Sequence, residues 1–74
     1  MNTIDYKKIG SNIERLIKES RFKTAQSFAL ECDRNPITVK RWIQDGVDNI
    51  NIINEIATKL DIDAMAILKG AVFN

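Results

Sequence analysis

The side chains with the clearest chemistry lie in residues 36–44, PITVKRWIQ. If these residues form a helix with Val39 and Trp42 turned inward, a rotation of about 100° per residue leaves a mixed face on the other side. That face carries methyl, hydroxyl, ammonium, guanidinium and amide groups, and its members are Ile37, Thr38, Lys40, Arg41 and Gln44. In the major groove of duplex DNA, Arg or Lys reads guanine, Gln reads adenine, and apolar groups contact the thymine methyl. We therefore take these five residues as candidates for base contacts.

Two short helices are expected to position this face. Thr24 can cap the first, over residues 24–32, whose apolar residues fall on one side. These are Phe28, Ala29 and Cys32. Proline forces the residue before it out of the α region, so Asn35 as cap with Pro36 at the first helical position predicts the start of the second helix. This helix ends near Gly46. Two helices joined by a turn of three to four residues form a helix-turn-helix.

The segment from residue 24 to residue 44 resembles the helix-turn-helix of the phage-repressor family (lambda repressor and Cro-like, XRE). Ala29 matches the family's small residue in the first helix, and Val39 with the pair Arg41-Trp42 matches the second. The sequence INEIATKLDIDAMAIL is similar to the family's fourth and fifth helices, so the resemblance covers roughly residues 9–68. It implies an all-α, compact five-helix bundle of the lambda-repressor-like DNA-binding type. It also implies sequence-specific binding of double-stranded DNA by a bacterial or phage transcriptional regulator, in particular a Cro/C1-type repressor.

Two positions depart from the family pattern. Asp33 stands where the family usually has Gly in the turn, and Asp tolerates left-handed geometry better than most residues. Pro36 and Ile37 stand where Gln or Ser often begins the second helix, and neither can make a bidentate base contact. Specificity would then rest on Lys40, Arg41, Gln44 and Thr38. The alternative is that Ile37 packs on a neighbouring helix or on a partner protein.

Three further helices complete the expected bundle, which we take as a single domain spanning residues 1–74. The first covers residues 5–20, with Ile9, Ile13, Leu16 and Ile17 at helical spacing and Gly10 as a mark of close helix contact. The other two cover residues 50–60, capped by Asn49 or Asp48, and residues 64–69, capped by Asp63 and ended by Gly70. No alternation typical of β-strands occurs.

The net charge is only +1, but it is unevenly distributed. Residues 1–41 hold nine Lys and Arg against five acidic residues, whereas residues 42–74 hold two against five. Phosphate contacts require local positive charge, and a helix N-terminus attracts phosphate through its dipole and free amides. The candidates for contacts to the DNA backbone are Lys18, Arg21, Lys23, Thr24, Gln26 and Asn35. The alternative is that these cations are simply solvated.

Enzymatic chemistry finds little support, because the chain has no histidine, one cysteine and three scattered glycines. We expect no catalytic residue, cofactor, metal or small-molecule site, and Cys32 is interpreted as a small core residue. No stretch is apolar enough to span a membrane, and the first ten residues lack a signal-peptide core, so a cytoplasmic location is expected.

Family members usually bind DNA as two-fold dimers, since one small module offers few contacts. Five apolar residues are expected to remain after the core is filled: Val47, Ile52, Met65, Val72 and Phe73. Of these, Met65, Val72 and Phe73 lie at the acidic C-terminal end, where a homodimer face would point the basic ends at adjacent grooves. The chain is alternatively the N-terminal part of a longer regulator. A different class also remains open, namely a protein-interaction or antitoxin-type module that keeps the fold without base readout and docks a partner through Ile37 and Ile43.

Overall fold

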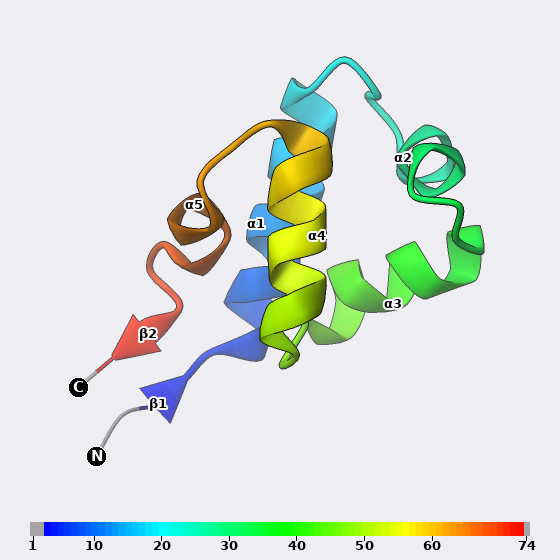
Figure 1. Cartoon of the computed structure of the whole chain (residues 1–74). Coiled ribbons are helices and arrows are strands. Elements are labelled where there is room, and N and C mark those ends of the chain that lie inside the picture. Colours follow the sequence, from blue (N-terminus) through cyan, green and yellow to red (C-terminus); the bar gives the residue numbers. More distant parts are fainter. Residues whose placement is uncertain (1–2, 74) are drawn as a thin grey trace.

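The computed structural model describes residues 3–73, which form five helices and one short antiparallel sheet (Figure 1). The elements are β1 (Thr3–Ile4), α1 (Tyr6–Glu19), α2 (Ala25–Glu31), α3 (Pro36–Asp45), α4 (Ile50–Leu60), α5 (Ala64–Leu68) and β2 (Val72–Phe73). The five predicted helices are therefore confirmed to within one residue at either end. The expectation of a purely helical chain is wrong at the two strands.

Each helix begins at the residue whose side chain can satisfy its free amide groups. The Oδ1 of Asp5 accepts from the Lys8 amide at 3.0 Å, and the Oγ1 of Thr24 accepts from the Ser27 amide at 3.1 Å. The same role is taken at α3, α4 and α5 by Asn35, Asn49 and Asp63. Side-chain oxygens of this kind are preferred caps because they replace hydrogen bonds that the first turn cannot make within the helix.

Three of the helices are followed by a residue with a positive φ. Asp33 has φ 55°, its amide donates to the Leu30 carbonyl, and the Arg34 amide reaches back to the Ala29 carbonyl at 2.9 Å. This pair of bonds is the Schellman arrangement. Gly46 with φ 80° follows α3, and Asp61 with φ 57° follows α4. The predicted turn at Asp33 thus forms without a glycine.

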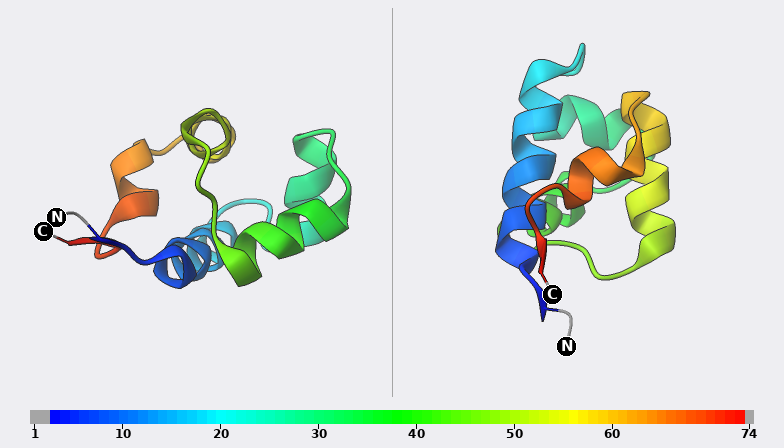
Figure 2. Two further views of the ribbon diagram at one scale, coloured as in Figure 1. Left: turned by 90° about the horizontal axis from the view of Figure 1, so that it is seen from below. Right: turned by 90° about the vertical axis from the view of Figure 1, so that its left-hand side faces the viewer.

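The core lies between α1 and the other helices. Figure 2 (right) shows α1 and α4 running in the same direction, with α5 crossing between them. The largest fully buried side chains come from every helix: Ile9, Ile13 and Ile17 of α1, Phe28 of α2, Val39 of α3, Ile56 of α4 and Ile67 of α5. Burial of these apolar side chains, worth about 1.5–3 kcal/mol each when complete, is what holds five short helices together.

Gly10 is the point where α1 meets α3. A Cβ added there would collide with the Ile43 carbonyl oxygen, and would lie 2.8 Å from the Ile43 carbonyl carbon and 2.9 Å from the Trp42 oxygen. Only glycine permits this approach of two backbones, so the predicted close helix contact at Gly10 is confirmed.

The two chain ends are fastened to each other. Thr3 pairs with Phe73 and Ile4 with Val72 in the sheet, and the Asp5 amide donates to the Ala71 carbonyl at 2.7 Å. Figure 1 shows β1 and β2 on the same side of the molecule. Strands of two residues carry no alternation that the sequence could reveal.

Asn12 is the buried polar residue of the core, and it connects α1 to the end of α5. Its Nδ2 donates to the carbonyls of Ile67 and Lys69, both at 2.8 Å. These carbonyls lie at and just beyond the last turn of α5, where helix carbonyls lack partners within the helix. One side chain therefore satisfies two acceptors that the fold would otherwise leave without a donor.

Two apolar residues that we expected to remain outside the filled core are in it or packed against it. Val47 is only 6% exposed, and Ile52 is half-buried against the same cluster. Val47 follows the turn at Gly46, whose positive φ redirects the chain so that Val47 joins the core cluster that also contains Ile9 and Ile53. Met65, Val72 and Phe73 are exposed, as expected. None of the helices described is long and apolar enough to cross a membrane.

Candidate nucleic-acid interface

The framework of the candidate interface is the pair α2 and α3, joined by the turn at residues 32–35. Ala29 is fully buried on α2, and Val39 and Trp42 are buried on the inner face of α3. The Schellman bonds of the turn and the Asn35 cap fix the backbone between the helices. α2 and α3 are therefore two packed helices joined by a tight turn.

The face of α3 predicted to point outward does so. Lys40, Arg41 and Gln44 are exposed, and Ile37 is 61% exposed. Thr38 is half-buried and offers less surface. Within residues 3–73, the side chains of these five residues make no hydrogen bond or ion pair, so their polar groups are free for a partner.

The start of α2 brings three of the predicted backbone contacts together. Lys23 is exposed and has φ 68°, a conformation unusual for a residue with a side chain. Thr24 and Gln26 follow directly and are exposed. The Thr24 oxygen is already occupied by the helix cap, which leaves its hydroxyl hydrogen as a donor. Asn35 has the same role at α3: its Oδ1 accepts from the Ile37 amide as the helix cap, and its side-chain amide hydrogens remain available as donors.

Lys18 and Arg21 lie elsewhere, at the far end of α1. The Arg21 guanidinium stacks over the Phe22 ring at 4.8 Å from the ring centre. Arg21 also lines a polar groove with Lys59 and Asp61 at the C-terminal end of α4. The structure thus places Arg21 beside α4, and it does not gather all six predicted backbone contacts into one cluster around α3.

Arg34, in the turn between α2 and α3, makes contacts that the sequence did not predict. Its Nε and Nη2 donate to both carboxylate oxygens of Glu55 at 2.9 and 2.7 Å, and its guanidinium stacks 5.3 Å from the centre of the Trp42 ring. The hydrogen bonds from Arg34 lower the pKa of Glu55 and raise that of Arg34. The pair joins residues 21 positions apart, so no local spacing in the sequence could have revealed it.

Cys32 lies half-buried next to the turn and packs against the core. Burial and then the neighbouring Glu55 carboxylate raise the pKa of its thiol. The thiol form is therefore favoured at neutral pH, and a reactive thiolate is not. Cys32 behaves as the core residue that the sequence predicted.

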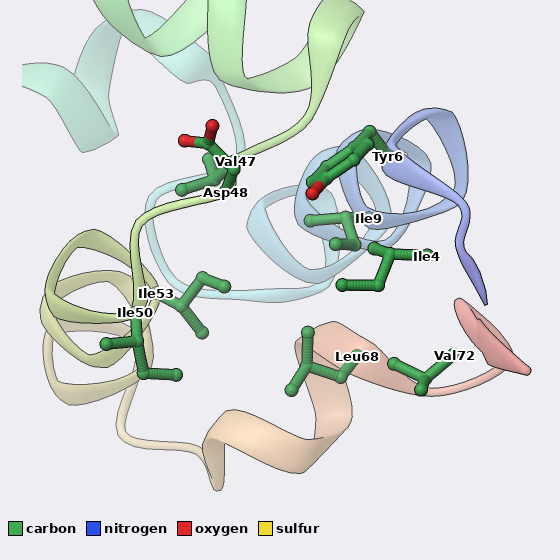
Figure 3. A pocket seen from close by; sticks show the side chains of 9 residues that line it. All are labelled: Ile4, Tyr6, Ile9, Val47, Asp48, Ile50, Ile53, Leu68 and Val72. Atoms are coloured by element: carbon green, nitrogen blue, oxygen red, sulfur yellow. The ribbon is translucent and has the colours of Figure 1, made fainter. Parts of the chain in front are cut away.

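A second surface feature is an apolar hollow of about 180 Å³ near the chain ends. Figure 3 shows its lining side chains converging from both ends of the chain and from α1, α4, α5 and the loop after α3. Its members are Ile4, Tyr6, Ile9, Val47, Asp48, Ile50, Ile53, Leu68 and Val72. The hollow is smaller than the roughly 300–1,000 Å³ typical of ligand pockets, and Asp48 is its only charged side chain.

No protein-family model, curated protein or solved structure matches this chain. A function must therefore be inferred from the arrangement of α2 and α3 and from the side chains on their exposed surfaces.

Proposed function

We propose that this protein binds duplex DNA through α2 and α3 and regulates transcription, as a repressor of the lambda-repressor-like type. The observation that carries the proposal is the outer face of α3. Val39 and Trp42 fix the helix from inside, and the opposite face presents Lys40, Arg41 and Gln44 without partners in the described chain. This is the combination of a rigid support and free polar groups that base readout requires.

The dimensions of α3 suit a major groove. Ten helical residues extend for about 15 Å, and the groove is roughly 12 Å wide, so the helix can lie in it with several side chains against base edges. Arg41 supplies a fork for guanine, Gln44 an amide for adenine, and Ile37 a surface for a thymine methyl. Lys40, on the flank, reaches either guanine or phosphate.

Contacts to the DNA backbone fall into two groups on this proposal. Four of the candidates lie at the N-terminal ends of α2 and α3, namely Lys23, Thr24, Gln26 and Asn35. On this proposal they contact phosphates beside the exposed face of α3 and fix the position of that face along the DNA. Lys18 and Arg21 lie at the end of α1 and act at longer range, through the local positive potential. Removal of a residue from the first group is therefore expected to affect binding more.

A second copy of the chain is part of the proposal. A single module of this size buries about 600–1,000 Å² on DNA, which limits affinity. Met65, Val72 and Phe73 are large, exposed and apolar, and they lie on α5 and β2, outside the helix-turn-helix. A two-fold dimer formed there leaves α3 of both copies free to enter successive turns of the groove.

The test begins with selection of a preferred duplex from a random library, followed by fluorescence anisotropy with that duplex and an unrelated one. Arg41→Ala is expected to weaken binding to the preferred site by about 1–3 kcal/mol and to relax one base position. Arg15→Ala is the matched control, because Arg15 is an exposed arginine of α1 that pairs with Glu19. Equal weakening on both duplexes would show that Arg41 contacts phosphate, and no binding of the wild type at low salt would refute DNA binding.

One observation favours a second candidate, a protein-interaction module. Leu30 on α2 is 74% exposed and Ile37 on α3 is 61% exposed, so the helix-turn-helix itself displays apolar surface. Ile43, which was expected to join this surface, is half-buried against the core and does not contribute. A module of this kind would bind no duplex at low salt, whereas the DNA-binding protein would bind with an affinity that falls steeply with salt.

A further inference from the structure

The turn between α2 and α3 is attached to α4 by a single polar connection. Arg34 holds both carboxylate oxygens of Glu55, at 2.9 and 2.7 Å. Among the side-chain hydrogen bonds and ion pairs of residues 3–73, no other joins residues 24–45 to the rest of the protein. The remaining attachment of this segment comes from apolar packing, the covalent chain and backbone hydrogen bonds at its two ends, such as those from the Thr24 amide to the Phe22 carbonyl and from the Gly46 amide to the Trp42 carbonyl.

Arg34 lies just before α3 and contacts both helices of the pair, α2 through its backbone and α3 through its side chain. Its amide donates to the Ala29 carbonyl, which fixes its backbone one residue before the Asn35 cap. Its guanidinium then lies over the Trp42 ring, 5.3 Å from the ring centre, and beyond it meets Glu55 in the middle of α4. The planar fork of arginine fixes direction as well as distance, which a lysine ammonium does not.

We propose that Glu55 is a positioning residue for base reading: through Arg34 it sets the orientation of α3 relative to the body of the protein. The inference rests on the proposed DNA binding of α3. Apolar packing resists separation of two helices more than it resists small sliding or rocking, whereas two directed hydrogen bonds resist both. Bidentate base contacts need such accuracy, and phosphate contacts made by flexible cations do not.

The sign of the effect separates positioning from simple electrostatics. Glu55 is an acid on α4, and its charge can only oppose a polyanion. If charge alone mattered, Glu55→Gln would strengthen binding to every duplex. If Glu55 positions α3, the same variant weakens binding to the preferred site and leaves binding to unrelated duplex unchanged or slightly stronger.

The experiment measures the ratio of affinities for the preferred and an unrelated duplex, with folding of each variant checked by circular dichroism. Glu55→Gln is expected to lower this ratio at least about fivefold, the low end of the cost of one faulty base contact. Arg34→Lys keeps the charge but loses the fork and should lower the ratio similarly. The double variant should add little to either, because both changes break one interaction.

Glu19→Gln provides the matched control. It removes an equal charge from an arginine-carboxylate pair, but that pair is exposed and lies entirely within α1. The ratio of affinities measured for Glu19→Gln should equal that of the wild type. If Glu55→Gln left the ratio of affinities unchanged, either because neither affinity changed or because both changed by the same factor, the positioning role would be overturned and DNA binding would stay intact. Absence of binding by the wild type would instead overturn the proposed function itself.

Discussion

Gly10 offers the most direct test of how α3 is held. Replacement by Ala places a methyl group against the Ile43 carbonyl group and 2.9 Å from the Trp42 oxygen. Both neighbours are backbone atoms of a helix, so no side-chain rotation can make room. The added methyl group must therefore push α1 and α3 apart, and the whole of α3 moves with it.

The expected cost follows from two opposing effects. Overpacking of a core typically costs about 1–3 kcal/mol, and the rigid neighbours here favour the upper end. Alanine regains about 1 kcal/mol over glycine inside a helix. The net loss in free energy of unfolding is then about 2 kcal/mol, which lowers the melting temperature by about 8–16 °C in a domain of this size.

Thermal and urea unfolding followed by circular dichroism measure this loss. Ser11→Ala is the control, since Ser11 is an exposed neighbour in the same helix and gains only helix propensity. We expect that variant to be slightly more stable than the wild type. If Gly10→Ala were as stable as the wild type or more so, the close approach of α1 to α3, and with it the placement of the exposed face of α3, would be wrong.

Three other substitutions test separate parts of the structure. Asn12→Ala removes the donor from two carbonyls and should lower the free energy of unfolding in urea by roughly 2–3 kcal/mol. Asp33→Gly should raise the midpoint of unfolding and Asp33→Ala should lower it, because φ 55° suits glycine and strains alanine. Arg34 lowers the pKa of Glu55 in the folded state, so this carboxylate adds stability above its ordinary pKa of 4.5 that is lost as the pH falls through the lower folded value. The difference in stability between wild type and Glu55→Gln should therefore shrink on acidification, and a difference independent of pH would contradict the ion pair.

The helices could be predicted from the sequence because their signals are local. A cap such as Asn35 bonds an amide two residues away, and the periodicity that turns Val39 and Trp42 inward repeats within one or two turns. The exposed face of α3 follows from the same geometry. These features depend on residues near one another in the chain, so one sequence is enough to find them.

The missed features join distant residues. Asn12 reaches carbonyls 55 and 57 positions away, and Arg34 meets Glu55 across 21 positions. Their partners are fixed by the angles at which helices pack, and those angles depend on the whole core. The strands at the chain ends also form only after α5 has brought residues 72–73 beside residues 3–4.

The ion pair of Arg34 also bears on how tightly one chain could hold DNA. Residues 23–45 contain four cations, and Glu55 occupies one of them, which leaves Lys23, Lys40 and Arg41. Affinity for DNA grows with the number of phosphates neutralised, so three free cations next to the reading face support only weak binding by a single chain. Tight binding on the proposed function therefore requires a second set of contacts, and pairing of two copies supplies it by doubling both the cations and the base contacts. The exposed apolar surface of Met65, Val72 and Phe73 and the shortage of free charge on α2 and α3 thus point to the same requirement.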